Sequence, residues 1–157
     1  MPIYKELLQE LEELIHSSSD RQSMMQRMCD RLHEEISRYN WVGFYLIDKD
    51  DPGFLMLGPH TGSFTPHARI SLGRGLCGTA ASSGRTVVVD DVTRDPRYLA
   101  GSDLIKSEIV VPIFVGKKLV CELDAESYFL ATFNGDEREF VEACGALVQR
   151  YLETHPE

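Results

Sequence analysis

The sequence predicts an α+β domain in which helices from both ends of the chain pack on one face of an antiparallel sheet. Three observations support this fold class. Apolar residues recur at helical spacing near both ends of the chain. Short aromatic and β-branched segments separated by turn residues predict hairpins between them, and hairpins imply antiparallel pairing. A short central helix and a long aperiodic loop are left to cover the other face, with room for a ligand beneath them.

The composition is that of a folded, acidic chain. It has 157 residues, with 16 Lys or Arg and 25 Asp or Glu, for a net charge of −9. This length fits one domain, 1–157, with helices over 3–38 and the sheet core and C-terminal helix over 39–155. The negative charge disfavours nucleic acid as a partner, because phosphate backbones attract Lys and Arg. No apolar run is long enough to span a membrane and the first residues lack a signal-peptide core, so we expect a cytoplasmic protein with no membrane partner.

Two helices are expected at the start of the chain. The segment 3–16 has apolar residues at helical spacing with Glu and Lys between them. The polar segment 17–20 interrupts this pattern and offers Asp20 as an N-cap for a second helix. The apolar face of that second helix consists of Met24, Met28, Leu32 and Ile36.

Strands are expected through the middle of the chain. In order they are 41–47, 54–57, 68–71, 86–90, 108–115 and 119–127. The turn residues at 49–53 and at 116–118 join the first two strands and the last two strands as hairpins.

Two further helices and one long loop complete the prediction. Small residues over 75–83 favour a short helix that ends at Gly84. A long helix is expected over 134–155, capped by Asn134 or Asp136. The segment 91–106 lacks periodicity and exceeds the usual length of a connection, which is typical of a binding loop.

The segment 73–78 matches the glycine pattern GxGxxG, but its surroundings do not support nucleotide binding. A dinucleotide site needs a βαβ unit and an acidic residue about 20 positions further on. Here the acids Asp90 and Asp91 come earlier and the neighbouring strands are predicted to form hairpins. A tight turn into a helix explains the glycines better.

An acidic row is the most informative feature of the last predicted strand. Glu122, Asp124 and Glu126 face one side of it, and the apolar residues between them face the other. Neighbouring members lie about 7 Å apart. Their repulsion is then about 0.6 kcal/mol in water and about 2.4 kcal/mol at an effective dielectric constant near 20. Two interpretations are open: the row is solvated, or it is buried and holds a cation or an ammonium group. Glu108 could join the row in either case.

The aromatic and histidine residues suggest a cage more readily than a metal site. Trp41 and Tyr45 share one face of a strand, where they either pack in the core or enclose a small apolar or sulfur-bearing group. The spacing of His60, His67 and Cys77 fits no standard metal site, so we expect exposed histidines and no bound metal.

Several longer segments together resemble the GAF domain family, and within it the free methionine-(R)-sulfoxide reductases. They are YNWVGFYL (39–46), LGPHTG (57–62), GRGLCGTAASSGRTVVVDDV (73–92), SEIVVPI (107–113) and LDAES (123–127). The resemblance covers about 39–151. It implies a six-stranded antiparallel sheet with the N- and C-terminal helices on one face and a ligand pocket under loops and a short helix on the other. It also implies a homodimer.

The same resemblance implies a pocket for free methionine sulfoxide. Residues that match Trp41 and Tyr45 surround the sulfur end of the ligand in that family. Acids that match Glu108, Asp124 and Glu126 hold its amino group. This agrees with the buried interpretation of the acidic row.

The cysteines of this chain depart from the pattern of the family. Active members resemble one another in three cysteines, and Cys77 matches one of them. His67, ten residues earlier, and Gly101, seven residues before Glu108, occupy the other two positions. Reduction needs an attacking thiolate and a second thiol that forms a disulfide, which a thioredoxin-type reductant then reopens. The standard mechanism therefore lacks two of its thiols.

Two functions remain. The one that we favour is a stand-alone, non-enzymatic GAF domain with a sensory or regulatory role, which binds a small amino-acid-like or sulfur-containing ligand and needs no cofactor. Backbone amides would meet a ligand carboxylate at Leu99, Ala100, Gly101 and Ser102. The alternative is an active L-methionine (R)-S-oxide reductase, in which Cys77 attacks and Cys121 or an external thiol resolves. Cys121 is expected to point away from the acidic row, which counts against that role.

Overall fold

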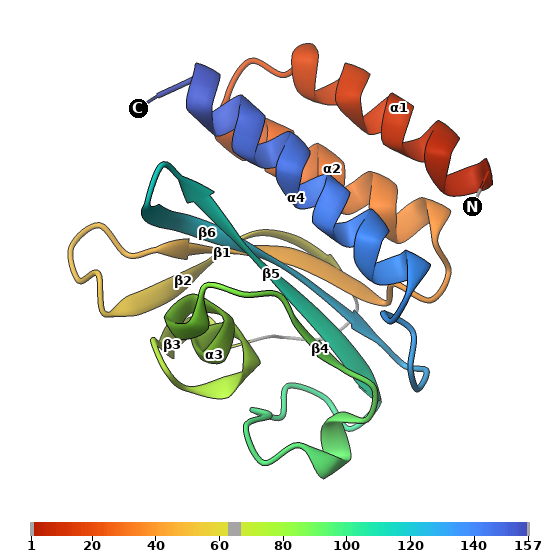
Figure 1. Cartoon of the computed structure of the whole chain (residues 1–157), viewed down its shortest axis with the longest axis vertical. Coiled ribbons are helices and arrows are strands. Elements are labelled where there is room, and N and C mark those ends of the chain that lie inside the picture. Colours follow the sequence, from red (N-terminus) through yellow and green to blue (C-terminus); the bar gives the residue numbers. More distant parts are fainter. Residues whose placement is uncertain (1, 63–66, 157) are drawn as a thin grey trace.

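A six-stranded antiparallel sheet lies between two layers of helices and loops (Figure 1). The structure is a computed structural model that describes residues 2–62 and 67–156. Its elements are α1 (Pro2–His16), α2 (Arg21–Glu35), β1 (Trp41–Ile47), β2 (Phe54–Gly62), β3 (Arg69–Ser71), α3 (Gly75–Ser83), β4 (Val87–Val89), the 3₁₀ turn η1 (Val92–Arg94), β5 (Ser107–Val115), β6 (Lys118–Ser127) and α4 (Asp136–Thr154). The predicted fold class and the order of its elements are confirmed.

The strand order is β3-β2-β1-β6-β5-β4, so β1 and β6 are the two central strands. Both predicted hairpins are present, β1 with β2 and β5 with β6. Gly116 has a φ of 63° in the turn between β5 and β6, a conformation that glycine adopts without strain. Because β1 and β6 lie in the middle of the sheet and are covered on both faces, the polar residues between Glu122 and Ser127 are buried, whereas Lys118 at the start of β6 is exposed.

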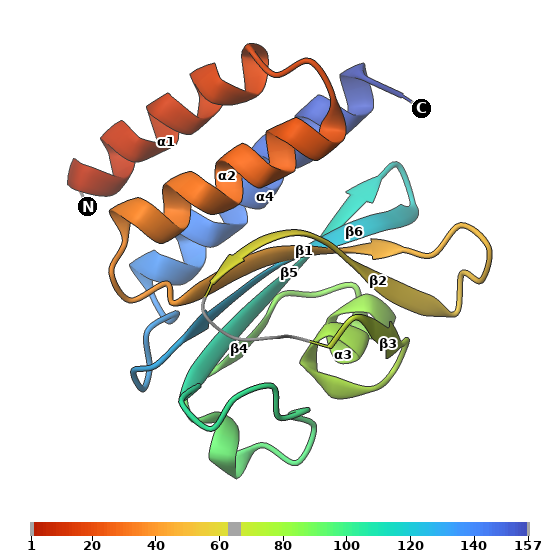
Figure 2. The ribbon, with the colours of Figure 1, turned by 180° about the vertical axis from the view of Figure 1, so that it is seen from behind.

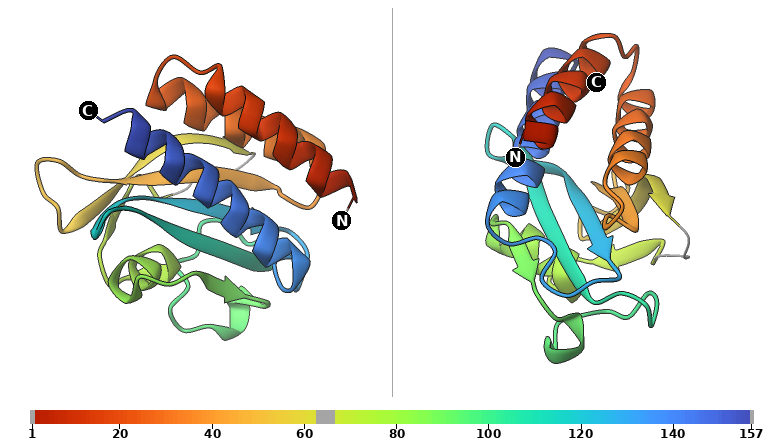
Figure 3. Two further views of the ribbon diagram at one scale, coloured as in Figure 1. Left: turned by 45° about the horizontal axis from the view of Figure 1, so that its top comes forward. Right: turned by 90° about the vertical axis from the view of Figure 1, so that its right-hand side faces the viewer.

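One face of the sheet carries the predicted terminal helices. Helices α2 and α4 rest on the strands, and α1 lies across these two helices as an outer layer (Figures 1 and 3). Asp20 caps α2 as expected, since its side chain accepts a hydrogen bond from the Ser23 amide at 2.8 Å. We call the apolar cluster between these helices and the sheet the helix-side core. The predicted α2 face belongs to it, as do Leu11, Phe44, Cys121, Leu123, Cys144 and Val148.

The opposite face of the sheet is covered by α3 and by the segment 90–106, which contains η1 (Figure 2). We call the apolar cluster between these segments and the sheet the pocket-side core. It includes Trp41, Tyr45, Ile70, Leu76, Cys77, Ile105 and Val110. The two cores therefore lie on opposite sides of one sheet.

The glycine-rich segment 73–78 forms a tight turn into α3, as predicted. Gly73 and Gly75 have φ angles of 87° and 67°. A Cβ at Gly78 would lie 2.8 Å from the backbone nitrogen of Gly73, so the two backbones approach too closely for any side chain. These glycines are explained by backbone geometry, and the strands around them are antiparallel.

Two of the differences from the predicted boundaries have a structural cause. Strand β2 continues to Gly62, whereas a loop was expected from His60, because β2 pairs with β1 as far as Trp41 opposite Gly62. Pro59, which has no N–H to donate, falls at an irregularity in this pairing. The N-cap of α4 is Gly135, with no side-chain hydrogen bond, and the Asn134 side chain instead donates to Asp90 at 3.4 Å.

Within the described residues, none of the helices combines the length and the apolar character needed to cross a membrane.

Candidate functional site

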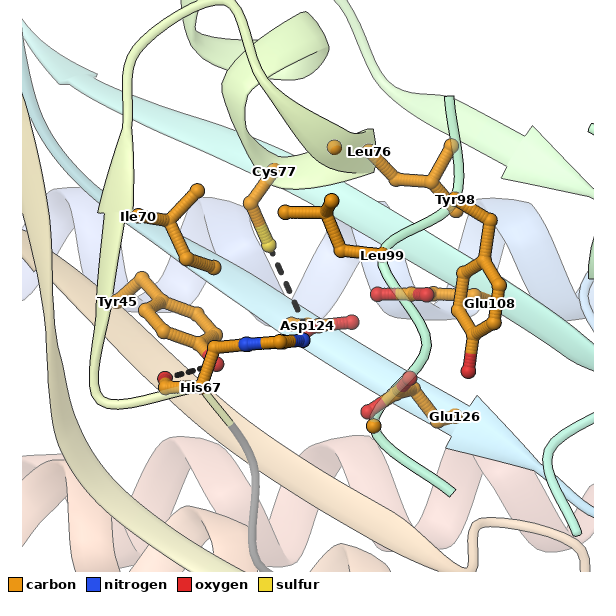
Figure 4. A pocket seen from close by; sticks show the side chains of 12 residues that line it. Tyr45, His67, Ile70, Leu76, Cys77, Tyr98, Leu99, Glu108, Asp124 and Glu126 are labelled. Atoms are coloured by element: carbon orange, nitrogen blue, oxygen red, sulfur yellow. Dashed lines mark hydrogen bonds between the residues drawn. The ribbon is translucent and has the colours of Figure 1, made fainter. Parts of the chain in front are cut away.

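A cavity of about 30 Å³ lies between the sheet, α3 and the loop 91–106 (Figure 4). Its position matches the pocket expected from the sequence. The described residues that line it are Tyr45, His67, Ile70, Gly75, Leu76, Cys77, Tyr98, Leu99, Gly101, Glu108, Asp124 and Glu126. The cavity as it stands holds about one water-sized group.

Three carboxylates from two neighbouring strands line this cavity. Asp124 and Glu126 are two residues apart on β6, so their side chains point to the same face of the sheet. Glu108 on β5 lies directly opposite Glu126 in the register. Asp124, Glu126 and Glu108 are 3%, 6% and 5% exposed, respectively. The acidic row is therefore buried, which decides between the two interpretations that the sequence left open. Burial follows from the central place of β6 and from α3 and the 91–106 loop above it.

The pKa values of these carboxyl groups are raised. For Asp124 burial raises the pKa to about 6, and for Glu108 and Glu126 burial and then the Asp124 charge raise the pKa well above its usual range. Lys and Arg are absent from the described lining residues. The site therefore holds either protons or a positively charged group at neutral pH.

Cys77 lies in the first turn of α3 with its sulfur directed at the carboxylates. Its Sγ donates to Asp124 Oδ2 at 3.5 Å (Figure 4). Burial, and then the charge of Asp124, raise the pKa of this thiol well above its usual value. A thiol in this environment stays protonated at neutral pH and is a weak nucleophile.

Of the aromatic pair, one residue lines the cavity and the other does not. Tyr45 lines the cavity, and its hydroxyl donates to the His67 carbonyl at 2.8 Å. The Trp41 ring lies 6.3 Å from the Tyr45 ring and is fully buried, but it is not among the lining residues. A Cβ at either Gly43 or Gly62 would lie 2.4 Å from the indole, so these glycines leave the space that the ring occupies. Trp41 therefore lies beside Tyr45 on this face of the sheet and directly opposite Glu126 in the register of β1 and β6.

The loop residues predicted as carboxylate partners are also divided. Leu99 and Gly101 line the cavity, whereas Ala100 and Ser102 do not. The Ala100 carbonyl is within 3.1 Å of His67 Nε2, and the Ser102 hydroxyl accepts from the Leu104 amide at 3.2 Å. Only two of the four positions can therefore reach a ligand in this arrangement.

The three positions that match the cysteines of the resembling family converge on this cavity. His67, Cys77 and Gly101 all line it, although they come from three separate segments. The contact of His67 with Ala100, next to Gly101, joins two of these segments. The convergence supports the assignment of the positions, and the side chains present there include only one thiol.

The positions of Cys121 and Cys77 on opposite faces of the sheet argue against Cys121 as an internal resolver, as its expected direction also did. Cys121 is fully buried in the helix-side core, whereas Cys77 belongs to the pocket-side core. The sheet separates the two thiols, while a disulfide needs Cα atoms within about 7 Å. Cys29 and Cys144 also lie in the helix-side core.

Sequence reasoning missed several residues of the site. Tyr98, Ile70 and Leu76 line the cavity, yet no motif or spacing singled them out. The pKa of the Tyr98 phenol is raised by burial and then by Glu126, which places it beside the carboxylates. Only the assignment of 91–106 as a binding loop could have suggested Tyr98.

Glu122 is a further buried acid on the same face of β6. It is fully buried, and neither carboxyl oxygen has a hydrogen-bond partner among the described residues. Burial, and then the charge of Asp124, raise its pKa well above the usual value. Glu122 does not line the cavity and so belongs to the layer beneath it.

One set of donor atoms has the spacing of a metal site. Cys77 Sγ and carboxylate oxygens of Glu108 and Asp124 lie within 4.8 Å of one another. His60 and His67 are both exposed, as predicted. They take no part in this set.

The comparisons with known proteins agree with the fold. A GAF domain family model matches residues 18–153, and this chain therefore belongs to the GAF domain family. Its relatives include the free methionine-R-sulfoxide reductase of Escherichia coli, 32% identical over 78% of this chain and 72% of that protein. GAF domain-containing protein A of Dictyostelium discoideum is 33% identical over 88% of this chain and 85% of that protein.

A solved structure also resembles this chain in fold and sequence. The free methionine-R-sulfoxide reductase from Neisseria meningitidis, crystallised in complex with its substrate, superposes with a TM-score of 0.90 at 35% identity. The match covers 96% of this chain and 88% of that chain. The relatives thus include named reductases and proteins named only for their GAF domain. Family membership alone does not choose between the two functions.

Proposed function

We propose that this chain is a ligand-binding GAF domain whose cavity recognises the ammonium group of a small amino-acid-like molecule. Free methionine sulfoxide and methionine are the first candidates. The observation that carries the proposal is the convergence of Glu108, Asp124 and Glu126, all buried, in a cavity without Lys or Arg among its described lining residues. An ammonium group donates to several carboxylates at once and offsets their mutual repulsion.

The remaining lining residues suit the rest of such a ligand. Tyr45, Ile70, Leu76 and Leu99 present apolar surface for a side chain that contains sulfur or carbon. The backbone near Gly101 is available for the ligand carboxylate. Because the cavity of about 30 Å³ is smaller than an amino acid, entry requires a shift of the 91–106 loop. Among the described residues, the contact of His67 with Ala100 spans the gap between this loop and the segment before β3.

We favour binding without catalysis, in a sensory or regulatory role. Reduction of a sulfoxide removes its oxygen as water and converts two thiols into one disulfide. Cys77 is held as a neutral thiol beside Asp124. The other cysteines, Cys29, Cys121 and Cys144, are in the helix-side core and cannot complete the disulfide.

A second candidate is a reductase that uses an external thiol. It is supported by the position of the Cys77 sulfur in the cavity and by the relatives that are named reductases. In this candidate Cys77 attacks the sulfoxide sulfur and a small thiol or a thioredoxin-type protein supplies the second sulfur. No organic cofactor is required, because the thiols supply both electrons.

Calorimetric titration tests the binding proposal. We expect free L-methionine-(R)-sulfoxide to bind saturably, and N-acetyl-L-methionine sulfoxide, which lacks the ammonium group, to bind about tenfold more weakly or worse. Glu126→Gln should weaken the free amino acid by a similar factor, because it removes a charge-assisted acceptor. Glu12→Gln, on the exposed surface of α1, is the matched control and should change nothing. Equal affinity for the free and acetylated compounds would contradict the proposal.

Turnover separates the two candidates. The protein is incubated with free methionine-(R)-sulfoxide and a thioredoxin system, and the release of methionine is followed. We expect binding without turnover. Turnover that Cys77→Ser abolishes would instead establish the reductase.

The homodimer that the resemblance implies is a separate proposal. Sedimentation velocity at several protein concentrations tests it without reference to the ligand. A single species with the mass of one chain at all concentrations would reject it.

A further inference from the structure

Three donor atoms in the cavity are arranged as ligands of one metal ion. Cys77 Sγ, a Glu108 oxygen and an Asp124 oxygen all lie within 4.8 Å of one another. The distance from Cys77 Sγ to Asp124 Oδ2 is 3.5 Å. Zinc bonds of about 2.3 Å to sulfur and about 2.0 Å to oxygen, set at a tetrahedral angle, also place the two ligand atoms about 3.5 Å apart. The site needs little rearrangement to accept such an ion.

One of these donors also lacks a hydrogen-bond partner for one of its oxygens. Asp124 is 3% exposed and lines the cavity, yet its Oδ1 has no hydrogen-bond partner among the described residues. Buried carboxylate oxygens without a partner are costly, because desolvation is not compensated. A metal ion in the cavity would supply the missing positive charge to this carboxylate.

The chemistry of the donors selects the class of metal. A thiolate is a soft ligand that favours Zn²⁺ or similar transition-metal ions, whereas Mg²⁺ and Ca²⁺ require oxygen ligands in larger number. The cavity of about 30 Å³ leaves space for a water as a fourth ligand. We infer that Cys77, Glu108 and Asp124 form a binding site for a divalent transition-metal ion such as Zn²⁺. Binding displaces the thiol proton of Cys77, as it does in other cysteine sites.

This inference goes beyond the proposed function and does not depend on it. The metal ion and an ammonium group would share Glu108 and Asp124, so their binding is mutually exclusive. Glu126, by contrast, is not a member of the donor set. It therefore distinguishes the two uses of the cavity.

Cobalt(II) is the probe for this site, because it substitutes for zinc and reports its ligands by absorption. The purified protein is freed of metal with a chelator and titrated with Co²⁺ alone. We expect one equivalent to produce a thiolate-to-cobalt charge-transfer band together with the visible bands of tetrahedral cobalt, and Zn²⁺ to abolish both. Cys77→Ser should remove the charge-transfer band and weaken Co²⁺ binding about tenfold or more. Asp124→Asn should weaken binding to a similar extent.

Two variants serve as matched controls. Cys29→Ser alters another buried cysteine, in the helix-side core, and should keep the band. Glu126→Gln should also keep it, even though the same substitution weakens the amino-acid ligand. Absence of a charge-transfer band in the unmodified protein, or a band that survives Cys77→Ser, would overturn the inference. Failure of the amino-acid ligand to bind would leave these outcomes unchanged and would count against the proposed function alone.

Discussion

The chemistry of a single side chain in this protein depends on its neighbours more than on its type. Cys77 occupies a position that matches a thiol of the resembling reductases, yet burial and the charge of Asp124 raise its pKa well above the usual value. The same position therefore supports a neutral thiol in the free protein and a metal-bound thiolate when a cation is present. Glu122 shows the same principle without any ligand, since burial and then the charge of Asp124 raise its pKa and favour its protonated form.

Glu122→Gln should be more stable than the unmodified protein, and this difference in the free energy of unfolding should grow as the pH rises. The native pKa of Glu122 is raised above 4.5, so the native state holds a proton that the unfolded state releases. The stability that Glu122 contributes is fully present below about pH 4 and is lost as the pH rises toward the native pKa, by about 1.4 kcal/mol per pH unit. Glutamine does not ionise, so the advantage of the variant should grow between about pH 5 and pH 8 in urea denaturation.

The matched control for this experiment is Glu12→Gln, which replaces an exposed carboxylate on α1. Its effect on the free energy of unfolding should be small, because this side chain is exposed. A difference between Glu122→Gln and the unmodified protein that stays constant with pH would reject the assignment of Glu122 as a buried neutral acid.

At the scale of elements, the β1–β2 hairpin is built around one indole ring. The chain has one Trp, and its ring lies over Gly43 and Gly62 on these strands, stacked on His60 at 5.9 Å. The bulge in this pairing lies beside Gly43. The hairpin thereby fixes Trp41 beside Tyr45, which lines the cavity.

Gly43→Ala should destabilise the protein by roughly 3 kcal/mol or more, because its Cβ would lie 2.4 Å from the indole. Displacement of the ring should also change the fluorescence of the single Trp. Gly53→Ala in the β1–β2 turn is the control, since its Cβ would meet only the end of the Asp51 side chain, at 3.3 Å. Similar losses for both variants in urea denaturation would contradict the role of Gly43.

The order of the elements could be predicted from the sequence because each carries its own local signal. Asp20 marks the start of α2, Gly84 has a φ of 69° at the end of α3, and the aromatic run at 41–47 reads as a strand. The end of β2 could not be predicted, because it depends on pairing with β1 rather than on the residues of β2 themselves. The predicted N-cap of α4 was wrong for a similar reason, because the Asn134 side chain contacts Asp90, which is distant in the sequence.

The candidate site was predictable only in part. Alternation along β6 placed Asp124 and Glu126 on one face, but whether that face is enclosed depends on α3 and on the 91–106 loop. The same limit explains Trp41, which shares a strand face with Tyr45 and yet is not among the residues that line the cavity. Tyr98 was missed because an aperiodic loop carries no pattern from which the direction of a side chain can be inferred.

At the scale of the whole molecule, the sheet divides the buried side chains into two separate apolar cores. The helix-side core holds Cys29, Cys121 and Cys144, and the pocket-side core holds Cys77. All four are buried and reduced. The division isolates the single thiol of the cavity from the others.

Mild oxidation should therefore produce no disulfide between Cys77 and Cys121. The Cys121 side chain belongs to the helix-side core and the Cys77 side chain to the pocket-side core, so the sheet lies between the two thiols. Mass spectrometry of peptides from the native protein, oxidised and digested without reductant, checks this expectation. A peptide pair that joins Cys77 to Cys121 would contradict the separation of the two cores, and the same treatment in urea serves as a positive control.

The positions 67, 77 and 101 come from three unconnected segments and meet only at the cavity. Two of them lie outside helices and strands, and the third is in the first turn of a short helix. Exchange of a side chain at any of these places alters the reactive groups that a bound molecule meets while the sheet and the large helices keep their packing. Very few substitutions at these positions can therefore change the chemistry of the cavity among thiol reactions, amine recognition and metal coordination, while the fold stays the same.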